Sequence, residues 1–126
     1  LFKEDKVIEF TTSGIGRRMK AAFDRNELYR ERKFLLQVDG DFIEKVQGIE
    51  TDETMIVQGI IDACFVEDGK YVIVDYKTDK VDKKETLVEE YKNQLNVYEK
   101  AVNQITNAEV AEKIIYSVEL GEEATV

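Results

Sequence analysis

Apolar side chains recur at helical spacing between residues 85 and 105. They follow one another at steps of four, four, three, four and three residues: Leu87, Tyr91, Leu95, Tyr98, Val102 and Ile105. This spacing places all of them on one face of an α-helix. The pattern therefore predicts an amphipathic helix over 85–105.

A weaker apolar stripe lies nearer the start of the chain. Ser13 is a suitable N-cap for a helix over 14–29, whose apolar positions are Ile15, Met19, Ala22, Phe23 and Tyr29. The apolar run that follows predicts a strand over 33–38. The polar stretch around Gly40 and Gly48 predicts a turn or a short strand.

Two segments rich in β-branched and aromatic residues, 54–65 and 71–78, flank the sequence Asp68-Gly69. Asp-Gly is a favoured pair for the type I′ turn of a two-residue hairpin. A last strand is expected over 113–120. The order of elements predicts an α/β fold with a mixed central β-sheet, in which an antiparallel hairpin is flanked by helices. Proline is absent and glycine is scattered, so one domain over 1–126 is expected.

Composition removes several classes of function. The 126 residues include no histidine and a single cysteine, Cys64. Catalysis by Ser-His-Asp or Cys-His groups within the chain, disulfides and Cys/His zinc sites are therefore excluded. No apolar run approaches the roughly 20 residues of a membrane span, and no signal peptide opens the chain. A cytoplasmic protein without membrane contact is expected.

The charge of the chain is strongly acidic, with 27 acidic and 18 basic side chains and a net charge of −9. This balance disfavours broad, charge-driven binding to nucleic-acid phosphates. The nearest local exception is the cluster Lys80, Lys83 and Lys84, which is a candidate phosphate contact or simply a solvated loop.

The predicted hairpin brings two aspartates together. If Asp68-Gly69 is the loop, Glu67 lies opposite Lys70, and the same register places Asp62 opposite Asp75. Alternation along strands puts Asp62, Asp75 and Lys77 on one face, with Ile60, Cys64 and Ile73. The other face takes Ile61, Ala63, Phe65, Val72, Val74 and Tyr76. Both faces are mainly apolar, so these charges are expected to be partly buried.

Two opposed carboxylates repel one another, and a divalent cation between them would offset this cost. Oxygen ligands without histidine or cysteine favour Mg²⁺, or Mn²⁺, over zinc. Lys77 would then lie beside the cation, where it can position a water molecule or stabilise charge on a phosphoryl group. Two alternatives remain open: Lys77 forms a structural ion pair with Asp75 or Asp62, or a β-bulge turns Asp62 to the other face.

Three motifs occur in order along the chain: Gly59-x-x-Asp62, Asp75-Tyr76-Lys77-Thr78 and Gln94-x-x-x-Tyr98. Together they resemble the RecB-type branch of the PD-(D/E)xK nucleases. The segment Arg30-Glu31-x-x-Phe34 and the run from Gln58 to Ala63 most resemble nuclease domains of bacterial ATP-dependent helicase-nucleases. The likeness covers roughly residues 12–120.

The resemblance implies a restriction-endonuclease-like core and a Mg²⁺-dependent DNA exonuclease for double-strand-break repair and recombination. It implies that Asp62 and Asp75 bind the metal with the backbone carbonyl of Tyr76, and that Lys77 is the catalytic lysine. Gln94 and Tyr98 would border the site and steady the lysine or the DNA. From spacing alone, Gln94 would be solvated and Tyr98 would pack in the core. Glu31 also matches a family position, but an ion pair with a nearby arginine explains it equally well.

One departure concerns the metal. Family members usually carry a further histidine ligand on an upstream helix, and this chain has none. We therefore expect a core of a larger helicase-nuclease, with weak metal affinity in isolation, whose motor delivers single-stranded DNA and which works with a second helicase-nuclease subunit. The competing hypotheses are a nuclease-derived docking module that no longer cuts and an unrelated acidic α/β interaction domain.

Overall fold

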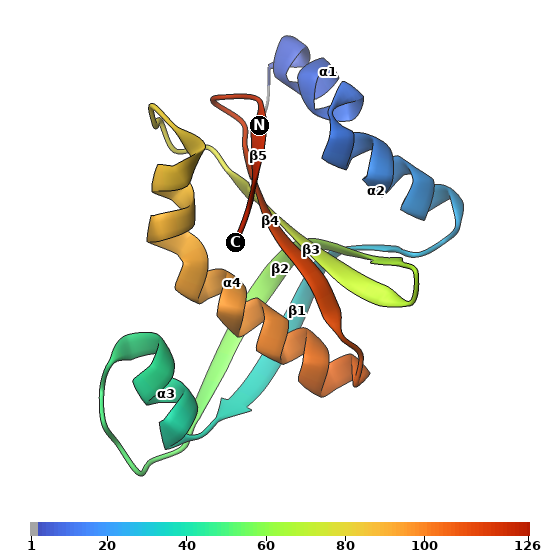
Figure 1. The fold of residues 1–126 in the computed structure, drawn as a ribbon. Helices are drawn as coiled ribbons and strands as arrows, with labels where there is room; N and C mark the ends of the chain where they lie inside the picture. The colour runs from blue at the N-terminus through green and yellow to red at the C-terminus, as the bar shows by residue number, and fades with distance from the viewer. Residues whose placement is uncertain (1–2) are drawn as a thin grey trace.

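The computed structural model describes residues 3–126, which form a five-stranded sheet with helices on both faces (Figure 1). The elements in chain order are α1 (Glu4–Thr12), α2 (Gly14–Asp24), β1 (Leu28–Val38), α3 (Gly40–Gln47), β2 (Met55–Glu67), β3 (Lys70–Lys77), α4 (Lys84–Thr106), β4 (Val110–Ser117) and β5 (Glu122–Thr125). The predicted α/β class, with a mixed sheet flanked by helices, is confirmed.

The strands lie in the order β1-β2-β3-β4-β5, and only β3 and β4 run parallel. A parallel pair needs a crossover connection, and α4 supplies it. Figure 1 shows α4 crossing one face of the sheet, with α1 and α2 beyond the other. None of the helices in residues 3–126 is both long and apolar enough to span a membrane.

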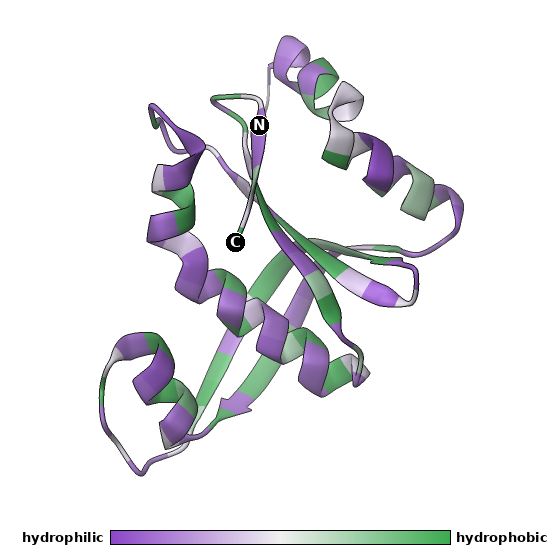
Figure 2. Ribbon diagram, in the orientation of Figure 1, coloured by the Kyte–Doolittle hydropathy of each residue, from purple (hydrophilic) through white to green (hydrophobic). Residues whose placement is uncertain are grey.

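Each sheet face has its own apolar core. On the α4 face, side chains of β1, β2 and β3 pack against Leu87, Leu95 and Val102. On the other face, Ile15 and Met19 of α2 pack against Phe65 of β2 and its neighbours. Figure 2 shows this alternation, with apolar colour along the strands and polar colour on the outer surfaces of the helices. Because both faces are covered, any charge in the central strands loses contact with water.

The central hairpin has the predicted turn and register. Glu67 pairs with Lys70, and the ladder continues in the same register to Ala63 and Val74. Asp68 and Gly69 have φ values of 52° and 78°, as a type I′ turn requires. The predicted helix over 85–105 is also confirmed, as α4.

The first half of the chain differs from the prediction in several places. Ser13 does cap a helix, since its hydroxyl accepts a hydrogen bond from the Gly16 N–H, but α2 ends at Asp24 instead of residue 29. Tyr29 lies in β1, which begins five residues earlier than the predicted strand, and Phe23 is exposed. The polar stretch is helix α3, because the Asp39 carboxylate caps the Phe42 N–H and Gly48 ends the helix in the left-handed region.

The end of the chain is also displaced. The predicted strand over 113–120 is β4, which begins at Val110 and ends at Ser117. The short polar tail forms the edge strand β5, antiparallel to β4. Helix α1 had no apolar pattern to announce it, and the structure buries none of its residues fully.

Alternation breaks where β1 and β2 cross the middle of the sheet. Pairing passes from Arg30–Ala63 to Arg32–Ile61, and Glu31 has a φ of 52°, a left-handed conformation within a strand. As a result Ile61 shares the α4 face with Cys64 and Ile73, so its predicted placement on the opposite face is wrong. The predicted partner on that face, Ile60, is half-exposed. The irregularity takes one residue from each strand, which preserves the register on both sides.

Candidate functional site

Asp62 lies where the ladder between β2 and β3 stops. The last backbone pair joins Ala63 to Val74. Beyond it, Oδ2 of Asp62 accepts a hydrogen bond from the Tyr76 N–H at 2.9 Å. The predicted backbone pair between Asp62 and Asp75 is therefore not formed, and the side chain of Asp62 bonds β3 instead.

The two aspartate carboxyl groups nevertheless meet. Asp75 is 2% exposed, and its carboxyl is in hydrogen-bonding contact with that of Asp62. Burial raises the pKa of Asp75 to about 6; the ammonium of Lys77 opposes this rise, and Asp62 adds to it. Removal from water costs the ionised form, and a neighbouring negative charge costs it more. The pair therefore holds its second negative charge weakly.

Lys77 supplies the compensating positive charge. Its Nζ lies 2.7 Å from Oδ2 of Asp75 and donates a hydrogen bond to Oε1 of Gln94 at 2.8 Å. The same nitrogen lies 4.0 Å from the centre of the Tyr91 ring, within cation–π range. The ion pair offered as an alternative at the sequence level is thus present, and it joins the two charged ends of the Asp-Tyr-Lys segment.

Helix α4 forms the wall over this cluster. The Tyr91 hydroxyl donates to Oδ2 of Asp79 at 2.7 Å, which ties α4 to the segment after β3. Tyr98 is buried and packs edge-to-face on Phe34, with ring centres 5.7 Å apart. Burial, with Asp75 and Asp62 nearby, raises the pKa of Tyr98 to about 12, so its hydroxyl keeps its proton. Sequence reasoning placed Tyr91 only in the apolar stripe, and its contact with Lys77 had no separate signal.

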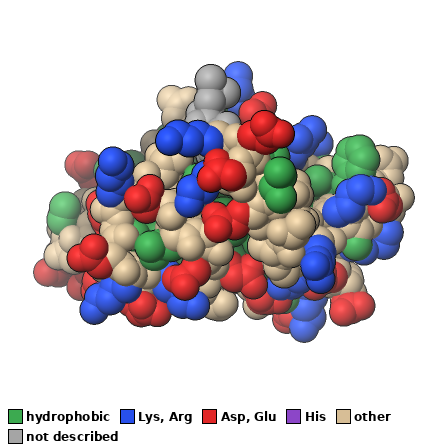
Figure 3. All heavy atoms as spheres, turned by 90° about the horizontal axis from the view of Figure 1, so that it is seen from above, with side chains coloured by type: hydrophobic (Ala, Val, Ile, Leu, Met, Phe, Trp, Pro, Cys, Tyr) green, Lys and Arg blue, Asp and Glu red, His purple; other side chains and the backbone are tan. Residues whose placement is uncertain are grey.

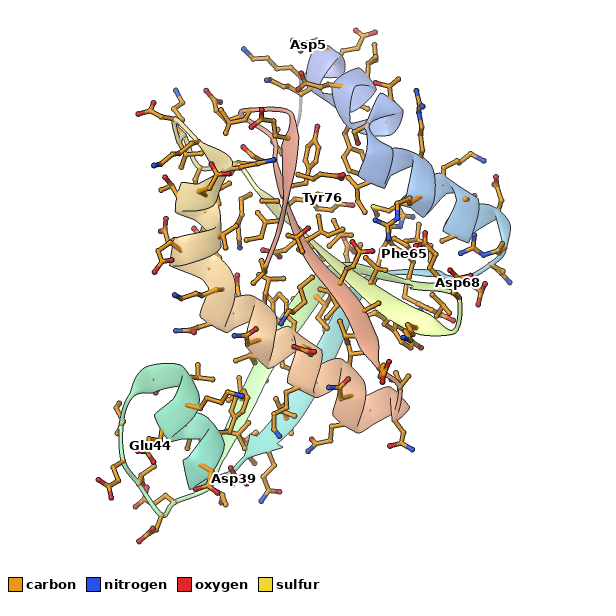
Figure 4. All side chains as sticks on the ribbon, in the orientation of Figure 1. Asp5, Asp39, Glu44, Phe65, Asp68 and Tyr76 are labelled. Carbon is orange, nitrogen blue, oxygen red and sulfur yellow. The ribbon has the colours of Figure 1, made fainter. Side chains whose placement is uncertain are left out.

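On the other side, Asp62 borders an open hollow of about 620 Å³. The hollow is lined by Phe10, Arg30, Glu31, Asp62 and Tyr76. Figure 4 labels Tyr76 between α1 and the sheet, where its ring packs edge-to-face on Phe10. Burial raises the pKa of Tyr76 to about 12; Asp62 adds to the rise and Arg30 opposes it. The hollow gives solvent access to the Asp62 side of the cluster, and no sequence pattern indicated that Phe10 belongs to it.

The lysines after β3 stay apart from this cluster. Lys80 is exposed and forms no hydrogen bond or ion pair within residues 3–126. Lys83 and Lys84 lie at the start of α4. Figure 3 shows acidic and basic side chains intermingled over the face seen from above, without a continuous basic patch. Any phosphate contact by Lys80 would therefore be local.

The donor set of the cluster suits a hard cation only in part. Within residues 3–126, no group of three or more histidine, cysteine or acidic side chains is placed to hold a metal ion. The two touching carboxylates are oxygen donors of the kind that Mg²⁺ and Mn²⁺ prefer. Such a pair fits a cation that keeps several water ligands, which agrees with the weak affinity expected from the sequence.

The chain belongs to the PD-(D/E)XK nuclease superfamily, because the family pattern matches residues 3–125. This confirms the resemblance on which the sequence analysis relied. The family match and the mixed sheet agree with each other, since the hairpin β2–β3 and helix α4 carry the three motifs.

Several curated relatives are large proteins that bear the name ATP-dependent helicase/nuclease. The chain is 36% identical to the one from Clostridium perfringens (strain 13 / Type A) over 126 residues, which cover 96% of this chain and 10% of the relative. It is 36% identical to the one from Geobacillus thermodenitrificans over 120 residues, covering 88% and 9%. The chain thus spans about a tenth of the length of these relatives.

A solved structure shares the fold. The protein described as "Crystal structure of SSO0001" superposes with a TM-score of 0.51 at 17% identity, covering 90% of this chain and 45% of the other. At this identity the likeness concerns the arrangement of helices and strands alone.

Proposed function

We propose that this chain is the metal-dependent DNA-cleaving module of an ATP-dependent helicase-nuclease that acts in double-strand-break repair and recombination. The observation that carries the proposal is the contact of the Asp62 and Asp75 carboxyl groups, with Lys77 2.7 Å from Asp75. Two carboxylates and an amine at one point suit phosphodiester hydrolysis. The names of the relatives support a helicase-nuclease as the larger protein.

In this proposal Asp62, Asp75 and the backbone carbonyl of Tyr76 hold Mg²⁺, or Mn²⁺. When bound, the cation would polarise the phosphodiester and lower the pKa of a water molecule. Asp62 is anchored for this role, because the Tyr76 N–H fixes one of its oxygens. Asp75 is fixed by its place in the central strand.

Lys77 and α4 would organise the reacting groups. Gln94 accepts a hydrogen bond from the Lys77 ammonium, and the Tyr91 ring lies beside it. Both contacts restrict where the ammonium can lie, so that it can orient a water molecule or stabilise charge developing on the phosphate. Tyr98 would keep the wall dry behind them, and Lys80 would contact a phosphate of the strand.

The acidic chain would depend on the larger protein for most of its grip on DNA. A net charge of −9 opposes capture of a polyanion, whereas a helicase motor can deliver a single strand directly to the site. A second helicase-nuclease subunit is the expected protein partner, and the cytoplasm is the expected location.

The isolated chain is expected to cut single-stranded DNA at least tenfold more slowly than a longer form of the protein that includes an upstream segment bearing a histidine. Two carboxylates and one carbonyl leave Mg²⁺ loosely held, and few positive side chains retain the strand. The test measures cleavage of single-stranded DNA by both forms at millimolar Mg²⁺. Equal, robust cleavage would contradict the incomplete metal site, and no cleavage by either form would contradict the proposed function.

Replacement of Gln94 tests the role of α4. Gln94→Ala in the longer form is expected to lower the cleavage rate about fivefold, since a hydrogen bond to a charged group contributes on the order of 1 kcal/mol when partly exposed. Gln104→Ala is the matched control, an exposed glutamine on the same helix. Equal rates in the two variants would remove Gln94 from the site.

A second candidate, a nuclease-derived docking module without activity, is favoured by one observation. The Lys77 ammonium already compensates the charge of Asp75, and residues 3–126 supply no third side-chain ligand of the histidine, cysteine or acidic type. Isothermal titration with Mn²⁺ distinguishes the two, because a docking module would bind no cation at Asp62 and Asp75 even in the longer form.

A further inference from the structure

A second, less polar pocket lies on the α4 face, where β1 meets the C-terminal end of α4. Its volume is about 380 Å³, within the usual range for small-molecule sites. Its walls include the rings of Tyr29 and Tyr71, whose centres are 6.4 Å apart, and the exposed side chain of Ile105. Cys64 lies in the lining and is 5% exposed. The pocket therefore offers aromatic and aliphatic surface to a flat apolar group.

The charge at the pocket is opposite to that of the chain. Arg32 and Lys33 are among the lining residues, and none of the lining residues is acidic, in a chain of net charge −9. Arg32 lies over the Tyr29 ring at 5.1 Å. Neither cation has a hydrogen bond or ion pair within residues 3–126. Their donors are available to an anion, and a guanidinium suits a phosphate group in particular.

The pocket adjoins the candidate active site. Phe34 lines the pocket and packs on Tyr98, while Ile61 lines it and directly precedes Asp62 in the chain. Along α4, Val102 of the pocket is one helical turn, about 6 Å, from Tyr98. A ligand there would lie beside the strand that the site cleaves.

We propose that this pocket binds one nucleotide, with the base against the Tyr29 and Tyr71 rings and the phosphate at Arg32 and Lys33. Aromatic rings with nearby cations are the usual means of holding single-stranded DNA without sequence preference. The inference rests on the proposed function, because it assigns the pocket to a unit of the DNA strand or to a released mononucleotide. The base and phosphate are common to both sources.

The only thiol of the chain makes the pocket accessible to measurement. Burial raises the pKa of Cys64 to about 11, so its alkylation by N-ethylmaleimide is slow and sensitive to what covers the pocket. The experiment measures the alkylation rate of the 126-residue chain by mass spectrometry without divalent cation. The additions are 5′-dAMP, a twelve-residue oligo(dT) or inorganic phosphate.

Both nucleotide probes are expected to slow alkylation at least threefold, and phosphate alone is expected to have no effect. Protection by oligo(dT) alone would identify the ligand as a unit of the strand, and protection by both would include a released mononucleotide. No protection by either probe, or equal protection by phosphate, would overturn the proposal.

Matched variants test the assignment of the two ends of the ligand. Arg32→Gln is expected to weaken the protecting nucleotide at least fivefold in its concentration dependence. Arg17→Gln, the same change at an exposed arginine of α2, is expected to leave it unchanged. Ile105→Trp, at an exposed pocket position, is expected to abolish the added protection by filling the pocket. Equal affinities in the two arginine variants would overturn the proposal even if the tryptophan variant failed to fold.

This pocket and the active site can fail separately. Cleavage by the longer protein without nucleotide protection of Cys64 would remove the pocket alone. Protection of Cys64 with no cleavage by either form would remove the nuclease assignment and leave a nucleotide-binding pocket.

Discussion

Asp75→Asn and Lys77→Gln, each introduced into the longer helicase-nuclease, are expected to lower DNA cleavage by roughly two to three orders of magnitude. Asp75→Asn keeps the shape of the side chain but removes the charge that a cation and Lys77 both need. Lys77→Gln removes the ammonium held between Asp75 and Gln94. The measurement is the single-turnover rate of cleavage of single-stranded DNA at saturating Mg²⁺, alongside the rate of ATP-driven unwinding.

The control is Asp68→Asn, at the tip of the hairpin, where asparagine also tolerates the φ of 52° (Figure 4). Cleavage by this variant should match the unaltered protein, and unwinding should be unchanged in all three variants. A parallel loss of unwinding and cleavage in a folded Asp75→Asn protein would contradict the assignment of Asp75 to the cleavage step.

The central part of this fold was predictable because local signals and packing agree there. The Asp68-Gly69 turn fixes the register of the hairpin, and the register brings Asp62 and Asp75 to the same level of the sheet. The spacing on α4 then fixes which residues cover them. Three local rules point to one arrangement, so the prediction did not depend on distant contacts.

The break at Glu31 and Asp62 was not predictable from spacing. Each strand alone has a plausible alternating pattern, and only the facing irregularity in its neighbour shows that the alternation stops. The same break lets Asp62 reach the Tyr76 N–H, a contact that a regular ladder would have given to the backbone. The side chains converge as predicted from the sequence, but through a local departure from regular pairing.

The elements missed at the ends of the sheet have weak signals of their own. Helix α1 buries no residue fully, and β5 contributes a single buried side chain, Ala124. Such segments acquire their structure from what they pack on, and their own sequence patterns carry little information. Helix α3 is different, because Asp39 and Gly48 are ordinary start and stop signals that were interpreted as a turn.

The Asp75→Asn variant of the isolated chain is expected to be more stable than the unaltered chain near pH 7, by on the order of 1–3 kcal/mol. In the folded chain, burial and Asp62 raise the pKa of Asp75 from 3.8 to about 6. Between these values the folded state holds more protons than the unfolded state, so the free energy of unfolding falls as pH rises. The neutral amide of the variant escapes this loss. Urea denaturation at intervals from pH 4 to pH 7 measures the difference.

The two chains should converge near pH 4, where Asp75 is protonated and uncharged like the amide, and separate through pH 6. Asp68→Asn again serves as the control and should show no pH-dependent difference. Mg²⁺ at millimolar concentration should then narrow the gap at pH 7, since a ligand that binds only the folded, ionised pair stabilises the unaltered chain and not the variant. A variant less stable than the unaltered chain at pH 7 would mean that attraction to Lys77 exceeds the cost of burial, which would reverse the electrostatic account of this site.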